Sequence, residues 1–135
     1  MIFIDSDAYL ALSLARDSHH ERANELFLEI KRRDEEYMTS WEVIDEVSTK
    51  LSRFTSRKQA LAFLDILFKS DIHIEYVLPE LSDQIHSLFV KQYSKKVSLT
   101  DCANMVIARR FGITTFFSFD HHYEQNGFTL LAKRP

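Results

Sequence analysis

The stretch Met1-Ile2-Phe3-Ile4-Asp5 places an acidic residue directly after a short apolar run, and it decides how the rest of the chain is interpreted. The run predicts a buried strand over residues 2–4. A carboxylate at the end of such a strand must be solvated, hydrogen-bonded or paired with a cation. The same arrangement recurs where Asp120 follows Phe116-Phe117-Ser118-Phe119. Ligands of open α/β sheets bind at the carboxyl ends of strands, so both carboxylates could face one cleft if their strands are neighbours.

Helix and strand patterns alternate along the chain between and beyond these two segments. Apolar residues recur at helical spacing in six segments, at residues 9–14, 23–30, 40–54, 60–68, 81–89 and 100–111. Further strands are expected at residues 37–39, 72–78, 115–117 and 128–131. Three of these helices have a candidate N-cap, which is Ser40, either Thr55 or Ser56, and Thr100, respectively. Gly112 suits the left-handed position that follows the end of a helix. The alternation predicts an α/β fold with three layers, a mostly parallel sheet between helices, because parallel strands need long crossovers.

Composition indicates a folded domain without disulfides. The 135 residues include two Gly and two Pro, so we expect a single domain over residues 1–135 without flexible linkers. One cysteine, Cys102, excludes an internal disulfide and favours a cytoplasmic protein. No apolar run is long enough to span a membrane. The net charge of −3 gives no global attraction to nucleic acid, although basic residues cluster locally, as in Lys31-Arg32-Arg33.

Two helices of the predicted fold supply further acids. Val43, Ile44 and Val47 lie on the apolar face of the helix over residues 40–54, and Glu46 is the acid closest to that face. Asp101 begins another helix, where the helix dipole and free N–H groups stabilise a carboxylate by about 0.3–1 kcal/mol. The dipole alone could therefore explain Asp101. If these acids converge, their repulsion requires a hard divalent cation such as Mg²⁺ or Mn²⁺.

Four blocks of the sequence together resemble a PIN domain, most closely the VapC-type toxin ribonucleases. The blocks are MIFIDSDAYLALSLARDSHHERANELF, TSWEVIDEVSTKLSR, SLTDCANMVIARRFGI and FFSFDHHYEQNGFTLL. The resemblance covers essentially the whole chain. It implies a nuclease that hydrolyses RNA with Mg²⁺ or Mn²⁺.

The resemblance also assigns roles to individual residues. Asp5, Glu46, Asp101 and Asp120 match the family's acidic positions and would be both catalytic and metal-binding, and Ser6 would have a secondary role beside them. Family members commonly form homodimers and are silenced by a partner antitoxin. Asp7 is less typical of its position, and we favour a cap on the first helix over a place in the site.

Several alternatives stay open at this point. Asp5-Ser6-Asp7 also resembles the start of haloacid-dehalogenase-type phosphatases, although the glycines of their later acidic loop are missing. A catalytically silent PIN-like module that binds RNA or protein is another alternative, but it would be expected to have lost its acids. Two histidine pairs, His19-His20 and His121-His122, are expected mainly in solvated positions. The aromatic residues fall mostly at core spacing and give little support for base stacking.

Overall fold

The computed structural model describes all residues from 1 to 135 and contains one five-stranded parallel sheet. Its strands are β1 (Ile2–Ile4), β2 (Tyr37–Ser40), β3 (His73–Glu75), β4 (Thr115–Phe117) and β5 (Thr129–Leu130). They lie in the order β3-β2-β1-β4-β5, and every neighbouring pair is parallel. The strands bearing Asp5 and Asp120 are neighbours, as the idea of a shared cleft requires, because β1 pairs with β4.

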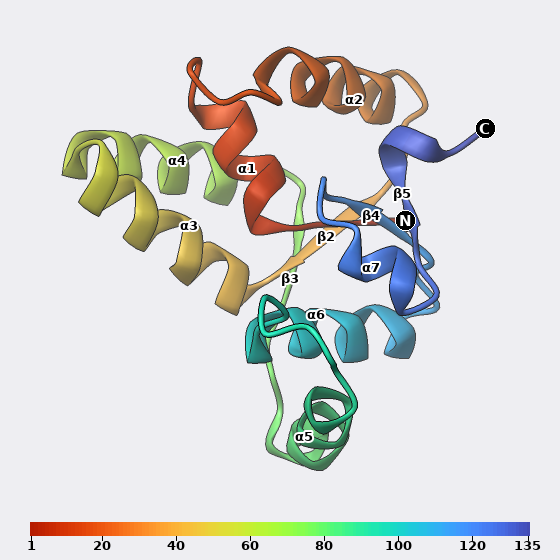
Figure 1. Cartoon of the computed structure of the whole chain (residues 1–135). Coiled ribbons are helices and arrows are strands. Elements are labelled where there is room, and N and C mark those ends of the chain that lie inside the picture. The colour runs from red at the N-terminus through yellow and green to blue at the C-terminus, as the bar shows by residue number, and fades with distance from the viewer.

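Helices flank the sheet on both sides, as the alternating pattern predicts. They are α1 (Ser6–Ser13), α2 (His20–Arg32), α3 (Trp41–Phe54), α4 (Arg57–Lys69), α5 (Ser82–Val90), α6 (Leu99–Arg110) and α7 (His122–Gln125), with short 3₁₀ turns at Pro79–Leu81 and Leu131–Lys133. Figure 1 shows α1 to α4 on one side and α5 and α6 on the other. The strands β1, β2 and β3 are added toward one edge of the sheet, and β4 and β5 are then added on the other side of β1. Because crossovers between parallel strands are right-handed, this change of order places the later helices on the opposite face. The predicted α/β fold with three layers is confirmed.

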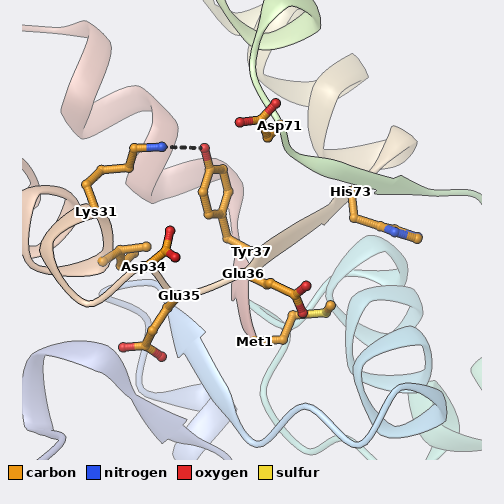
Figure 2. A pocket seen from close by; sticks show the side chains of 9 residues that line it. Met1, Lys31, Asp34, Glu35, Glu36, Tyr37, Asp71 and His73 are labelled. Atoms are coloured by element: carbon orange, nitrogen blue, oxygen red, sulfur yellow. Dashed lines mark hydrogen bonds between the residues drawn. The ribbon is translucent and has the colours of Figure 1, made fainter.

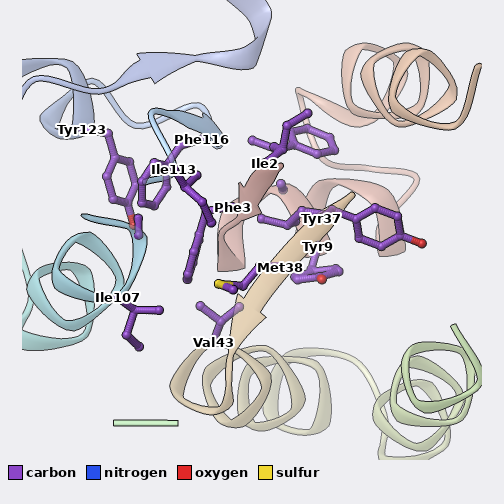
Figure 3. Packing of buried hydrophobic residues seen from close by; sticks show 14 of the residues in the cluster. Ile2, Phe3, Tyr9, Tyr37, Met38, Val43, Ile107, Ile113, Phe116 and Tyr123 are labelled. Carbon is purple, nitrogen blue, oxygen red and sulfur yellow. The ribbon is translucent and has the colours of Figure 1, made fainter. Parts of the chain in front are cut away.

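A continuous core joins the two helical layers through the sheet (Figure 3). Phe3 of β1 stacks on Phe116 of β4 with ring centroids 4.9 Å apart, and Phe116 stacks on Tyr123 at 4.0 Å. All three side chains are fully buried. The strands β1 and β2 are fully buried, and the burial of β1 on both faces explains why it appears in the sequence as a continuous apolar run.

Local signals set most helix ends, with two corrections. Ser40 caps α3 by accepting from the Val43 N–H at 3.2 Å, and Gly112 has the expected positive φ of 67°. However, α6 is capped by Ser98, so the predicted cap at Thr100 lies two residues too late. The short α7 was not predicted, because four residues are too few to show a helical period.

Candidate active site

Asp5 lies where the carboxyl ends of three neighbouring strands meet. It follows β1 and is only 4% exposed. Asn104 of α6 donates to Asp5 Oδ1 at 3.3 Å, and the Ser118 hydroxyl, just after β4, lies 3.4 Å from Asp5 Oδ2. Ser40, at the end of β2, donates to Asn104 Oδ1 at 2.7 Å and thereby orients its amide. Each of the three strands thus supplies a polar group to this network.

Burial and neighbouring acids make the ionised form of Asp5 unfavourable. Loss of solvent raises the pKa of Asp5 well above its ordinary value, and the negative charges of Asp7 and Asp101 raise it further. The backbone N–H of Ser6 lowers this pKa only in part. The Ser6 hydroxyl makes no hydrogen bond to any of the acids, so its predicted secondary role gains no support. A bound cation would relieve the cost of ionising Asp5.

Asp7 does not cap the first helix, contrary to our expectation. The N-cap position of α1 belongs to Asp5, and no side chain caps this helix. Asp7 Oδ2 instead accepts from the Ser118 hydroxyl at 3.0 Å and from the Phe119 N–H at 2.8 Å. Its other oxygen is buried without a partner, and burial raises the pKa of Asp7. Asp7 therefore joins the acidic network and fixes the segment that leads to Asp120.

Asp101 has a structural role in addition to its place near Asp5. Its carboxylate accepts from the Ser98 N–H at 2.8 Å, and the Ser98 hydroxyl accepts from the Asp101 N–H at 3.0 Å. This reciprocal capping box fixes the start of α6. The structural explanation considered for Asp101 therefore applies, and the capped carboxylate also acts electrostatically on Asp5.

His122 lies between Asp120 and Asp101. Its Nδ1 is 2.7 Å from Asp120 Oδ1, its Nε2 is 3.6 Å from Asp101 Oδ2, and its side chain is 6% exposed. Neither contact has hydrogen-bond geometry. The expected solvated position is wrong for His122 and correct for His121, whose exposed ring contacts Glu124 at 2.8 Å. His122 becomes buried because Asp120 accepts from its backbone N–H and so starts the unpredicted α7.

Glu46 is separate from the other predicted acids. Its carboxylate is bound by Lys50 at 2.6 Å, one turn further along α3, and no ion pair or hydrogen bond joins it to Asp5, Asp101 or Asp120. The structure thus places the other three predicted acids near one another, where Asp101 acts electrostatically on Asp5 and lies across His122 from Asp120. Sequence reasoning missed Asn104 and Ser118, although a lone amide in the apolar run around Asn104 was a usable signal.

The oxygen atoms at this site are of the chemical type that binds a hard divalent cation. Carboxylate oxygens are the ligands that Mg²⁺ and Mn²⁺ prefer, and the unpartnered oxygen of Asp7 lies among them. However, no three acidic, histidine or cysteine side chains already surround one point. The network is therefore two linked groups, Asp5 with Asp7 and Asp101 with Asp120 across His122, which a cation would have to draw together.

A separate pocket of about 340 Å³ lies at the other edge of the sheet, where the strands begin (Figure 2). Lys31 donates to the Tyr37 hydroxyl there at 3.3 Å, and Asp34, Glu35 and Asp71 line the rim. None of the predicted site residues lines it. Ligands of parallel sheets bind at the carboxyl edge, so this pocket is not the candidate active site.

No helix of the structure is long and apolar enough to cross a bilayer.

Comparison with known proteins supports the resemblance found in the sequence. The chain is 28% identical over 128 residues to the 23S rRNA-specific endonuclease VapC20 of Mycobacterium tuberculosis, covering 95% of both proteins. The crystal structure of that protein, described as a sarcin-ricin loop cleaving toxin, superposes with a TM-score of 0.85 at 26% identity and covers all of both chains.

A second solved structure shares the fold alone. VapBC2 from Rickettsia felis, bound to a DNA fragment from their promoter, has a TM-score of 0.69 and 17% identity over 96% of this chain and 97% of the other. The family model for the PIN domain matches residues 2–128. These findings confirm the sequence-based assignment: the chain belongs to the PIN domain family.

Proposed function

We propose that this protein is a divalent-metal-dependent endoribonuclease and that residues 1–135 form a single nuclease domain. The observation that carries the proposal is the buried Asp5, whose pKa is raised by burial and by the charges of Asp7 and Asp101 at the carboxyl edge of the sheet. PIN domains are metal-dependent nucleases, and the relative VapC20 is named as an endonuclease of 23S rRNA. The predicted ribonuclease class is therefore confirmed, whereas the choice of Mg²⁺ or Mn²⁺ belongs to the proposal.

The proposed catalytic and metal-binding residues are Asp5, Glu46, Asp101 and Asp120. A bound cation would supply positive charge that neutralises the phosphodiester and helps to activate the attacking water. The chain itself holds Asp5 through Asn104 and Ser118. Ser118 also accepts from the Asp120 N–H at 3.1 Å, so one hydroxyl links the loops of two acids.

Glu46 must exchange its partner to take part. In the ion pair, the Glu46 side chain is 31% exposed and the Lys50 side chain is 43% exposed. Ion pairs as exposed as this contribute only about 0–1 kcal/mol to stability. Exchange of Lys50 for a bound cation would therefore cost little. The freed Lys50 would then be available to a phosphate of the RNA backbone.

We also propose that the protein is the cytoplasmic toxin of a toxin–antitoxin pair and acts as a homodimer. The description of the related VapC20 structure as a toxin supports the proposed toxin role. A mostly apolar pocket of about 320 Å³ between α1, α2 and α4, lined by Leu12, Phe27, Phe63 and Ile66 among others, suits an apolar segment of an antitoxin. The buried free thiol of Cys102 is consistent with a reducing compartment.

The two alternative functions lose support. The phosphatase alternative conflicts with the family of the chain. A silent binding module would not be expected to retain four acids, three of them near one another.

Cleavage of a mixed RNA pool by the purified protein tests the proposal. We expect cutting with Mn²⁺ or Mg²⁺, none with EDTA, and none by the Asp5→Asn variant under any condition. Cutting that persists in EDTA, or full activity of the variant, would show that this site is not the catalytic one.

A further inference from the structure

Three exposed aromatic rings lie parallel to one another on the surface of the protein. Trp41 stacks with Tyr76 at a centroid distance of 5.7 Å and an angle of 16°, and with Phe68 at 6.4 Å and 17°. The exposed fractions are 42% for Trp41, 54% for Phe68 and 52% for Tyr76. We call these three residues the aromatic platform. The expectation that the aromatic residues serve mainly the core is therefore wrong for this group.

Two residues of the aromatic platform, Trp41 and Tyr76, lie at the same edge of the sheet as Asp5, and Phe68 in the last turn of α4 packs against Trp41. Trp41 directly follows Ser40 of β2, and Tyr76 directly follows Glu75 of β3, which pairs with Ser40. Neighbouring strands are about 4.8 Å apart, so the ends of β2 and β3 lie roughly 5–10 Å from the end of β1. The hydrogen bonds from Ser40 through Asn104 to Asp5 bridge that interval. Figure 1 shows the start of α3 beside the ends of these strands.

A second aromatic stack lies on the other side of Asp5. Phe119, which precedes Asp120 in the loop after β4, stacks on the partly exposed ring of His19 at 4.2 Å and 16°. The strand order β3-β2-β1-β4 places Asp5 between this pair and the aromatic platform. Aromatic surfaces therefore flank the acidic network on both sides along one edge.

We propose that the aromatic platform stacks unpaired RNA bases next to the phosphate that is cleaved. This inference rests on the proposed ribonuclease function. Every base has a flat face, and stacking on an aromatic side chain is the usual way in which unpaired bases are held by proteins. The three half-exposed rings lie near acids that would bind the phosphate only with a cation. Base stacking would therefore supply affinity that the negative charges at this edge cannot.

Trp41 is the only tryptophan of the chain, so its fluorescence reports on the aromatic platform directly. The protein for this experiment is the Asp5→Asn variant, which should not cut RNA. Its tryptophan emission is recorded during titration with a single-stranded oligoadenylate of about twelve nucleotides, and separately with an RNA duplex of the same length. We expect quenching by the single strand and little change with the duplex, whose bases are already stacked.

The affinity for the same labelled oligoadenylate, measured by fluorescence anisotropy, completes the test. Removal of one stacked base should weaken binding by about 5- to 150-fold in Trp41→Ala, whereas Trp41→Phe should retain most of the affinity. Tyr93→Ala is the matched control, because Tyr93 is a fully exposed aromatic residue outside the aromatic platform. Its affinity should be unchanged.

Two results would overturn the inference. The first is RNA binding with unchanged tryptophan emission and unchanged affinity in Trp41→Ala, which would leave the ribonuclease function intact. The second is emission that shifts on dilution of the protein alone and ignores RNA, which would identify the aromatic platform as a contact between two copies of the chain. Cleavage of the RNA pool tests the proposed function separately.

Discussion

Replacement of Asp5 by Asn is expected to stabilise the metal-free protein while it removes the activity. A buried ionised carboxylate costs the folded state several kcal/mol even after relaxation. The two hydrogen bonds from side chains to Asp5 are long, at 3.3 and 3.4 Å, and return at most about 1.5 kcal/mol each. We therefore expect Asp5→Asn to raise the free energy of unfolding by about 1–3 kcal/mol at neutral pH.

The variant side chain can satisfy the same partners. Its carbonyl oxygen would accept from Asn104, and its amide would donate to the Ser118 hydroxyl, which keeps its own proton for Asp7 at 3.0 Å. A gain of this size corresponds to a rise in the melting temperature of roughly 4–10 °C for a domain of this length.

The dependence of this stabilisation on pH identifies the ionisation of Asp5 as its cause. The folded-state pKa of Asp5 is raised above its unfolded value, so the charge costs nothing below the unfolded pKa, where both states are protonated. The cost grows as the pH rises from the unfolded pKa to the folded pKa and is complete above the folded pKa. Hence the advantage of Asp5→Asn should be small near the ordinary aspartate pKa of 3.8 and largest at neutral pH.

Thermal unfolding in EDTA, followed by circular dichroism at several pH values, measures this advantage. An excess of Mn²⁺ should then stabilise the wild type and not the variant, because only the wild type would bind the cation in its folded state. A variant that is less stable than the wild type at neutral pH, or a gain that does not change with pH, would refute the reasoning.

Three further predictions concern neighbouring residues. Asp101→Asn should lower RNA cleavage at least about 100-fold. Its unfolding free energy, measured by urea unfolding, should change by less than about 1 kcal/mol, because the amide oxygen can still accept from the Ser98 N–H. His122→Ala should weaken Mn²⁺ binding in calorimetry by about 10- to 100-fold, since it contacts both Asp101 and Asp120; unchanged affinity would show that the contact has no role at the site. Ser40→Ala should lower the unfolding free energy by about 2 kcal/mol, because it removes the cap of α3 and the bond to Asn104; an unchanged urea midpoint would contradict this.

The sequence predicts the layers of the fold well because its strand segments are short and separated by long amphipathic segments. The neighbouring position of β1 and β4 was assumed rather than predicted, since apolar runs carry no information about which strand pairs with which. The helix ends at Ser40 and Gly112 follow from local chemistry, whereas the start of α6 depends on a choice between several hydroxyl residues near Ser98.

The site was only partly predictable for a physical reason. The acids at strand ends are visible because a charge next to a buried run is costly. The role of Asp7 and the burial of His122 depend on the loop after β4, whose path is set by tertiary contacts between residues more than one hundred positions apart. The ion pair of Glu46 with Lys50 shows the same limit, because the periodicity that places Glu46 on the flank of α3 does not say which partner holds it.

Calorimetric titration of Mn²⁺ into the metal-free wild type and the Asp5→Asn variant tests the central claim most directly. If Asp5 and its neighbouring acids form one cation site, the wild type should bind the ion and the variant should lose that binding while it remains folded. Absence of binding by the wild type, or equal binding by both proteins, would contradict the account.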